Sequence, residues 1–541
     1  MRKYILVICL AFLLSRLVFL DQFFLSRDER DLSLTGYSIA KTGKDLFGNN
    51  MPVSFERISP NAPFAAVYYD ALWWLTPLAK NVFNARLAFV LPASLLPFLV
   101  YELIYILSKQ RRYALATSII FSFSPWVFHI SRMALEVNLA LPLLLAGVIL
   151  QLKGRRWLSI IFYGLAFFTY QGMRPLIGVL PIFLEARNFF AAKIELKKTL
   201  NSIFLFLGFF VLALVASVLM ERGIRARSIN EIVFFNWPKL SKEVQFLRSV
   251  SYGPELIKPV FDNKIAKAAD YTTVNLLKGL DISYLFKTGD YDEKYANGIA
   301  GQFFLATLPF MFLGLIFFKK KPISHYFAAG LMLVGLVPAV INTYSLTFSV
   351  RAIVSAIGFS FIIAVGLIDG FTVLAKNRHT AVRLLIYAGF IFFAVFEVSG
   401  FYYHYFFSRF GLYSEVFSEA DRKVAGHLEN GRKYKIVSPL PYQTLMDYVF
   451  LTEVSAMDMP GLARTIKGRY DDFSFKGNAF VSCEKMANSR PEDLRMTIMN
   501  ELCISGEKKP LLEKLKIKTI PYSSYVPYKY ETKPAYYIFE N

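Results

Sequence analysis

Two adjacent carboxylates follow the first apolar stretch of the chain. Asp28 and Glu29 lie in the charged run 26–31, directly after the apolar residues 4–22. A carboxylate at a membrane surface, beside a partly dry cavity, can act as a general base or bind a metal ion. A solvated run of charges at the end of a spanning helix would have the same sequence. The local string therefore makes Asp28 and Glu29 candidate catalytic residues and leaves the solvated interpretation open.

Four arginines stand at the ends of other apolar stretches, on the face that should be poor in basic residues. They are Arg86, Arg132, Arg174 and Arg351. A guanidinium binds phosphate oxygens through two parallel hydrogen bonds, so a set of arginines at one membrane level suits a phosphate or diphosphate. The alternative is that each arginine reaches toward the interface or pairs locally, as Arg132 could with Glu136 one turn later.

The composition limits the kind of protein that carries these residues. The 541 residues are 55% hydrophobic and 19% charged, with a mean hydropathy of +0.41. Because soluble chains carry about 25% charged residues, a simple soluble enzyme, a disordered scaffold and a disulfide-rich secreted domain are excluded. The net charge is +21, but the basic residues occur mainly in short clusters between apolar runs, so nucleic acid is not an expected partner. The chain is predicted to be a polytopic membrane protein.

Eleven apolar runs are long enough to be read as spanning helices, which need about 20 mostly apolar residues. The runs are 4–22, 86–107, 113–130, 134–152, 157–171, 174–190, 199–220, 299–318, 324–341, 351–370 and 384–402. Basic clusters fall at every second connection, and such clusters mark the cytoplasmic side. This alternation places the loops 23–85 and 221–298 and the tail outside. Counting the apolar segment 62–80 as a span would reverse the pattern, so we expect a helix lying in the membrane interface there.

The tail has a different composition from the rest of the chain. Short β-like runs at 434–437, 479–482 and 536–539 alternate with helical candidates at 491–502 and 510–517. We therefore expect two domains: a transmembrane domain over 1–402 and a soluble extracytoplasmic α/β domain over 403–541. Cys483 and Cys503 both lie in this tail and could form a disulfide if it is external.

Several motifs resemble the opening of GT-C glycosyltransferases. They are Asp28-Glu29, the run 40–45 (AKTGKD), the run 60–63 (PNAP), Tyr68-Tyr69 and the run 85–87 (ARL). The likeness is to the branch that contains protein O-mannosyltransferases and the lipid A aminoarabinose transferase, a glycosyltransferase family 39-like group. The segments 124–132, 169–174, 285–290 and 338–351 agree with uncharacterised bacterial members, so the resemblance covers most of residues 1–410.

The resemblance implies an inverting transfer of a hexosyl or pentosyl group at the external face of a bacterial cytoplasmic membrane. The donor would be a polyprenyl phosphate sugar reached from the bilayer, and the acceptor a protein, lipid or glycan. Asp28 would take the proton of the acceptor hydroxyl while the lipid phosphate leaves. The implied substrate-binding set is Asp45, Arg86, Arg132, Tyr170, Gln171, Arg174 and Arg351.

One departure from the family pattern affects the phosphate contact. The aminoarabinose transferases carry a lysine before their paired prolines, whereas residues 58–61 read ISPN here. The phosphate contact is therefore expected from Arg86, Arg174 or Arg351. No cofactor is indicated, and a divalent metal held by Asp28 and Glu29 stays an open alternative.

Two other function classes compete with the enzyme. A transporter or flippase of lipid-linked glycans should place charges near the middle of several spans and often shows internal repeats. Here the predicted spans are nearly free of charge, and no repeat is evident. A membrane-anchored binding protein whose tail does the work is the third interpretation. The gathering of ionisable groups at one face favours the enzyme.

Overall fold

The computed structural model describes most of the chain. It covers residues 2–539 except 54, 56–63, 221–231, 291, 293, 344–347, 377–379, 410–418, 429–431, 453–471, 487–495, 505–517 and 527–528. The chain forms two compact units. The helical unit comprises residues 1–18 and 89–404, and the mixed unit comprises residues 19–88 and 405–541. The loop that carries Asp28 thus belongs to the same unit as the tail.

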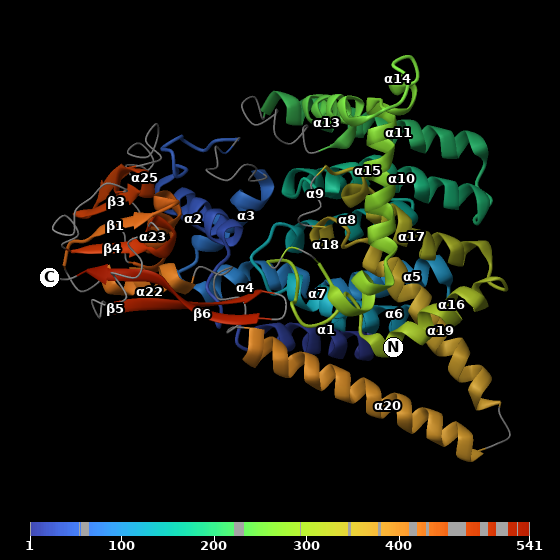
Figure 1. Cartoon of the computed structure of the whole chain (residues 1–541). Coiled ribbons are helices and arrows are strands. Elements are labelled where there is room, and N and C mark those ends of the chain that lie inside the picture. Colours follow the sequence, from blue (N-terminus) through green and yellow to red (C-terminus); the bar gives the residue numbers. More distant parts are fainter. Residues whose placement is uncertain are drawn as a thin grey trace. The chain divides into compact units, whose positions relative to one another are not determined.

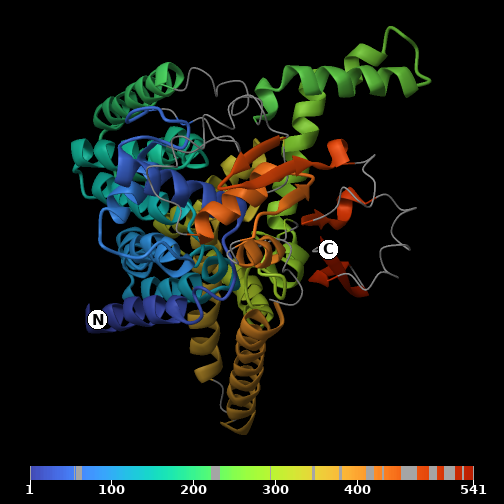
Figure 2. The same ribbon diagram turned by 90° about the vertical axis from the view of Figure 1, so that its left-hand side faces the viewer.

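The helical unit is built almost entirely of α-helices (Figure 1). In chain order they are α1 (Arg2–Leu17), α5 (Leu96–Ser108), α6 (Arg111–Phe123), α7 (Pro125–Ile130), α8 (Val137–Leu152), α9 (Arg156–Thr169), α10 (Met173–Phe190), α11 (Leu196–Met220), α13 (Trp237–Val250), α14 (Lys258–Phe261), α15 (Lys264–Leu280), α16 (Leu308–Phe318), α17 (Ile323–Val340), α18 (Phe348–Arg351), α19 (Ser355–Ala375) and α20 (Thr380–Tyr403). Each of the eleven predicted runs contains helix. The segment with α13 and α14 extends away from the other helices of this unit (green, Figure 2).

Among the described residues, five helical stretches are long and apolar enough to cross a membrane: Val82–Ser108, Leu196–Met220, Ile323–Val340, Ser355–Ala375 and Thr380–Ser408. Their outer surfaces are apolar as well. Leu385, Phe392 and Phe396 of α20 are 76%, 74% and 69% exposed. Such side chains are stable in hydrocarbon and unfavourable in water, so the chain is a multi-pass membrane protein. The count of eleven spans stays a prediction.

Helix α19 is buried along its first half, from Ser355 to Gly366, and approaches its neighbours through glycines. A Cβ on Gly366 would lie 1.8 Å from the carbonyl oxygen of Phe310 on α16, and one on Gly358 would lie 2.2 Å from the backbone nitrogen of Met332 on α17. Backbones can come this close only where a side chain is missing. Helices in a membrane associate through such packing, because lipid leaves no hydrophobic drive between them.

The mixed unit combines helices of the first loop with the sheet of the tail. Its helices are α2 (Arg27–Thr42), α3 (Phe64–Trp74), the start of α4 (Val82–Ala93), α22 (Glu419–Leu428), α23 (Pro441–Leu451) and the short α25 (Cys483–Met486). The strands are β1 (Lys435–Ser438), β2 (Asp472–Phe475), β3 (Asn478–Ser482), β4 (Thr497–Asn500), β5 (Lys518–Val526) and β6 (Lys529–Phe539), in the order β2-β3-β1-β4-β6-β5. Strand β1 runs parallel to β3 and β4, and the other pairs are antiparallel.

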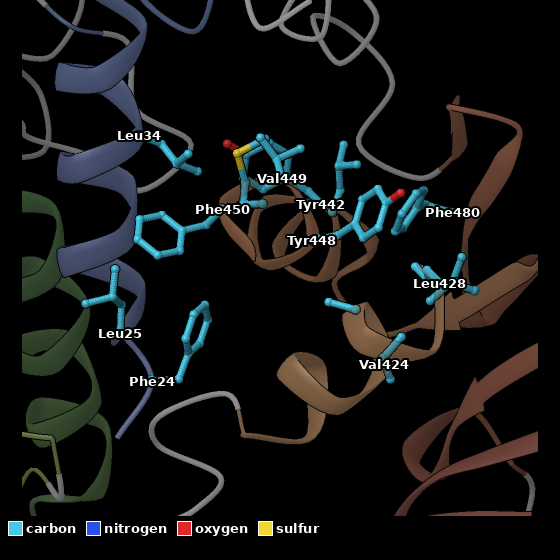
Figure 3. Close-up of a cluster of buried hydrophobic side chains, with 14 of the residues drawn as sticks. Phe24, Leu25, Leu34, Val424, Leu428, Tyr442, Tyr448, Val449, Phe450 and Phe480 are labelled. Carbon is cyan, nitrogen blue, oxygen red and sulfur yellow. The ribbon is translucent and has the colours of Figure 1, made fainter. Parts of the chain in front are cut away.

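One hydrophobic core joins the first loop to the tail. Phe24 and Leu34 from the loop belong to the same buried cluster as Val449 and Phe450 of α23 (Figure 3). The rings of Phe24 and Phe450 meet edge to face, with centroids 5.8 Å apart. Because this core is assembled from both segments, neither segment buries its apolar face alone.

The sequence predictions for the tail are met in part. The three β-like runs coincide with β1, β3 and β6, and Cys483 is joined to Cys503 by a disulfide. The predicted helix 491–502 is wrong where the structure describes it, because Thr497–Asn500 is β4. This strand pairs with β1 on one side and β6 on the other, and two ladders of backbone hydrogen bonds outweigh local propensity. The candidate 510–517 lies outside the described residues.

The segment 62–80 contains the helix α3, which has 11 residues. At 1.5 Å per residue such a helix is roughly 16 Å long, too short to span a bilayer. Its buried residues include Asp70 and Trp74, and it packs against α2 within the mixed unit. The expectation that this segment does not span is consistent with that length, while its position in the interface stays a prediction.

The contact between α2 and α3 can be tested at a glycine. A Cβ on Gly36 would lie 2.2 Å from Oδ2 of Asp70, the oxygen that accepts a 2.9 Å hydrogen bond from Trp74. Overpacking of this kind costs about 1–3 kcal/mol, which exceeds the gain of about 1 kcal/mol in helix propensity from Gly to Ala. Gly36→Ala should therefore lower the melting temperature of the purified protein.

Gly426 supplies the matched control in the same unit. It is an exposed residue of α22, and a Cβ there would meet nothing within 4 Å. Gly426→Ala should raise the melting temperature by helix propensity alone. Equal shifts of the two variants in the same direction would contradict the packing of α2 on α3.

Candidate active site at the start of helix α2

Helix α2 begins at the charged run that the sequence singled out. Ser26 has an extended backbone (φ −63°, ψ 161°), and its N–H donates a 2.8 Å hydrogen bond to the Glu29 carboxylate. A Ser followed three residues later by Glu is a common way to start a helix, because it satisfies backbone donors that have no partner inside the helix. Asp28 and Glu29 therefore lie in the first turn, where the helix dipole stabilises negative charge.

The charges of this turn differ sharply in burial. Glu29, Arg30 and Asp31 are 0%, 1% and 4% exposed, whereas Asp28 is partly exposed and Arg27 is exposed. Of the three carboxylates in the run, Asp28 is the one that reaches the surface. Its neighbours are committed to contacts inside the protein.

Glu29 is held by Arg86, from helix α4. The Arg86 Nε donates to Oε1 of Glu29 at 2.9 Å and one terminal nitrogen donates to Oε2 at 3.2 Å. The remaining N–H groups of Arg86 donate to the carbonyl oxygens of Leu20, Phe23 and Phe24 at 2.8–2.9 Å. All five donors of this guanidinium are thus used within the mixed unit. The ion pair between Glu29 and Arg86 holds the first turn of α2 against α4, and the other Arg86 contacts hold it against the chain that precedes α2.

Arg30 is held from the other side, by α23 of the tail. It donates to Oδ1 of Asp447 at 2.5 Å, to the carbonyl oxygen of Gln443 at 3.2 Å and to the side-chain oxygen of Gln443. Its remaining two donors reach Oδ1 of Asp31 at 3.1 and 2.8 Å. This guanidinium is also saturated, and it joins residues more than 400 positions apart.

The buried acids around Arg30 have shifted titration. Burial raises the pKa of Asp447 to about 7, although the positive charge of Arg30 works in the opposite direction. Burial also raises the pKa of Asp421 on α22, against a 2.7 Å hydrogen bond that it accepts from Tyr536. The negative charges of Asp421 and Asp31 add to the rise in the pKa of Asp447.

Asp45 organises a turn after α2. Its Oδ1 accepts hydrogen bonds from the backbone N–H groups of Phe47 and Asn49 at 2.9 and 2.8 Å, and its Oδ2 accepts one from the Asn49 side chain at 2.9 Å. Asp45 is 1% exposed. These contacts give it a structural task, and its predicted role in substrate binding stays a prediction.

The other predicted site residues belong to the helical unit. Arg132 precedes α8 and donates to the carbonyl oxygens of Ser15 and Arg16 at 3.3 and 2.8 Å, at the carboxyl end of α1. A cation there satisfies carbonyls that have no partner inside the helix. Arg132 therefore has a capping role in α1, in addition to any role in binding.

Tyr170, Gln171 and Arg174 lie together at the turn from α9 to α10. The Tyr170 ring packs so closely over Gly172 that a Cβ there would lie 2.4 Å from it. The guanidinium of Arg174 lies 5.1 Å from the centre of the Phe167 ring, within range of a cation–π interaction. Arg174 and Gln171 are partly exposed.

Arg351 ends the short helix α18, which two hydrogen bonds at Ser349 hold in place. Asp290, from the segment 285–290, accepts a 2.7 Å hydrogen bond from the Ser349 N–H, and the Trp126 indole donates to the Ser349 carbonyl at 3.0 Å. Arg351 is partly exposed. The backbone just before this arginine is thereby fixed from two sides.

The structure thus brings some candidates together and separates others. Glu29 contacts Arg86 beside Asp28 in the mixed unit, and Asp45 lies in a turn of its own. Arg132, Arg174 and Arg351 stand on three different elements of the helical unit. In the part of the chain that the structure describes, no group of three His, Cys, Asp or Glu side chains could hold a metal ion.

Sequence reasoning missed the partner of Arg30. Asp447 is the single charged residue of the segment Pro441–Leu451, and a lone acid in an apolar helix is the signal that could have pointed to it. Its partner lies at the other end of the chain, so the sequence alone does not supply the pairing.

Comparison with known proteins finds likeness in structure only. No family model and no curated protein matches the sequence. The crystal structure of the Archaeoglobus fulgidus oligosaccharyltransferase in the apo form is similar, with a TM-score of 0.48 and 11% identity over 98% of this chain and 74% of that chain. ArnT from Cupriavidus metallidurans in the apo state has a TM-score of 0.47 and 13% identity over 95% of both chains.

A further structure of ArnT, bound to undecaprenyl phosphate, has a TM-score of 0.43 and 12% identity over 95% of this chain and 96% of that chain. Identities of 11–13% with TM-scores below 0.5 assign no activity to the chain.

Proposed function

We propose that the chain is a membrane glycosyltransferase that moves a sugar from a polyprenyl phosphate to an acceptor hydroxyl, with inversion, and that Asp28 is its general base. The observation that carries this proposal is the state of Asp28. It is an accessible carboxylate at a helix start, and the residues after it are locked by two buried ion pairs. A base fixed in this way can be held against an incoming hydroxyl.

The proposed chemistry assigns proton transfer to Asp28 and stabilisation of the leaving phosphate to arginines. A carboxylate of pKa about 4 is a weak base for an alcohol, so the proton moves late, as the hydroxyl oxygen attacks the anomeric carbon and the bond to the phosphate breaks. General-base assistance of this kind contributes about 10²–10⁴-fold. Guanidinium groups in a site of low dielectric would stabilise the charge that develops on the leaving phosphate.

The arginines fall into two groups under this proposal. Arg86 donates all five of its N–H groups to Glu29 and to backbone carbonyls, so we assign it a structural role in holding α2 in place. Arg174 and Arg351 are partly exposed and remain the proposed phosphate ligands, with Arg132, Tyr170 and Gln171 as further candidates for contact with the substrate.

The shared core of the mixed unit supports the proposed topology. Residues 19–88 and 405–541 pack into one unit, so they must lie on the same side of the membrane, and the segment between them must cross an even number of times. The disulfide between Cys483 and Cys503 suits an oxidising, extracytoplasmic compartment. We propose that this side is the external face of a bacterial cytoplasmic membrane.

The role of Asp28 can be separated from that of its neighbour by substitution. Asp28→Asn keeps the shape but removes the basic lone pair, so transfer of radiolabel from polyprenyl phosphate sugars should fall by about 10²–10⁴-fold with little change in melting temperature. Glu29→Gln breaks a buried ion pair, which costs about 3–5 kcal/mol, and should lower the melting temperature. Near-normal turnover in Asp28→Asn would remove the catalytic assignment.

The proposed phosphate ligands can be tested by substituting lysine for arginine. Lys keeps the charge of Arg but loses its two-pronged geometry, and a lost charge-assisted hydrogen bond is worth roughly 1.5–3 kcal/mol. Arg174→Lys or Arg351→Lys should therefore weaken donor affinity or rate by about 10- to 150-fold, measured as transfer against donor concentration. Arg27→Lys, at an exposed position of α2, is the control. Wild-type kinetics in both arginine variants would exclude them as phosphate ligands.

The topology can be checked with a reporter that is active only in the cytoplasm. Fused after Asn541 it should be silent, because the tail is proposed to be external. Inserted after Lys320, in a basic cluster between two predicted spans, it should be active. Activity at Asn541 would place the tail, and with it the loop that carries Asp28, inside the cell.

A further inference from the structure

We infer that Arg30 and Asp447 are positioning residues, through which the tail of the chain sets the direction of the Asp28 carboxylate. This inference rests on the proposed function. It assigns a task to the tail, in which the sequence shows no catalytic motif.

The two anchors lie on successive residues of one helical turn. Glu29 is bound by Arg86 from α4, and Arg30 is bound by Asp447 from α23. Neighbouring residues of an α-helix point about 100° apart. Two fixed points separated by that angle prevent the first turn from rotating about its axis, and rotation is the movement that would swing Asp28 away from an acceptor.

Apolar packing would not supply this control. Phe24 and Leu34 already press this region of the chain against α23 (Figure 3). Contacts between apolar side chains are not directional, so they hold the helix near α23 without fixing its rotation. The saturated guanidinium of Arg30 is directional, because all five of its N–H groups donate to acceptors on Asp31, Gln443 and Asp447.

The cluster is poorly designed for stability alone. Among the described residues, Oδ2 of Asp31 and Oδ2 of Asp447 are buried and accept no hydrogen bond. Buried ion pairs can often be replaced by apolar residues without loss of stability, and their best-supported use is to select one arrangement over others. An arrangement that leaves two buried carboxylate oxygens unsatisfied is consistent with such a selective role.

The contact between Arg30 and Asp447, called the clamp from here on, should respond to pH in a way that separates positioning from stability. The groups that face Asp447 are Arg30 and Asp31 from α2 and Asp421 from α22. Burial raises the pKa of Asp447 to about 7, above its value in an unfolded chain, so the folded state binds the proton more tightly. Acidification from pH 8 to pH 6 therefore stabilises the fold through this group, while it removes the charge that holds Arg30.

Stability and turnover should consequently move in opposite directions in the wild type. Between pH 8 and pH 6 the melting temperature should not fall, whereas kcat should decrease. Asp447→Asn should have a low kcat at both values and lose this part of the pH profile. If the residue were only structural, kcat would follow the melting temperature.

The decisive experiment compares kcat and KM for radiolabelled polyprenyl phosphate sugars in the full-length protein. Asp447→Asn and Arg30→Gln should each lower kcat by about 10- to 100-fold, the size of effect expected of a small misplacement, with less than about a twofold change in KM. The double variant should be no worse than either single one, because both remove the same contact.

A destabilised tail with an intact clamp is the matched control. Removing the disulfide with Cys483→Ser and Cys503→Ser weakens the tail away from α2. This control should lower the melting temperature and leave kcat close to the wild type. If it loses as much kcat as Asp447→Asn, or if Asp447→Asn keeps wild-type kcat, the inference is overturned.

A second measurement is independent of activity. Cys9 is the free cysteine, so Asp28→Cys in a Cys9→Ser background provides a single reactive thiol. Adding Asp447→Asn should change its rate of alkylation by a charged maleimide several-fold, whereas Cys483→Ser with Cys503→Ser, which leaves no further thiol, should not change it. An unchanged rate would overturn the inference, whether or not Asp28 proves catalytic.

The transfer activity of Asp28→Asn separates the proposed function from the inference about Arg30 and Asp447. If that variant keeps its activity, the proposed function fails, while the alkylation rate still reports on the clamp. Should Asp447→Asn fail to fold, Gln443→Leu removes one acceptor of Arg30 and leaves the ion pair in place. It should lower kcat several-fold at an unchanged melting temperature, and wild-type kcat would count against the clamp.

Discussion

The shared core of residues 19–88 and 405–541 is the constraint on which the rest of the structure depends. The loop after the first helix and the tail are separated by more than 300 residues of chain, yet their apolar side chains form one buried cluster. This core brings α23 of the tail against α2, the helix that carries Asp28.

The charged run at the start of α2 shows how burial separates residues of similar chemistry. Asp28, Glu29 and Asp31 are carboxylates within four positions, and each has a different environment. Glu29 and Asp31 are buried against arginines, which offset the loss of solvation by charge-assisted hydrogen bonds. Asp28 is partly exposed to solvent, and it is the residue that we propose as the general base. Arg30 and Arg86 hold the charged run in place, since the donors of both side chains are saturated within the protein.

The helices of the helical unit pack against one another in a different way. Helices in lipid gain nothing from hiding apolar surface from one another, so close contact must come from shape. The glycines of α19 allow the backbones of α16 and α17 to approach it, and the exposed leucines and phenylalanines of α20 suit a hydrocarbon environment.

The sequence by itself determined the membrane class, the positions of the apolar helices and three of the strands. These features depend on hydrophobicity and on residue type, which are local and can be read from neighbouring residues. It also marked Asp28, through a motif whose residues lie side by side. The tertiary structure decided what each charge does. Arg86, which the sequence offers as a phosphate ligand, binds Glu29 57 positions away, and Arg30 binds Asp447 417 positions away. Strand β4 likewise exists through its two neighbours, against the local expectation of a helix. Such pairings depend on which segments the fold brings together, and no local pattern encodes that distance.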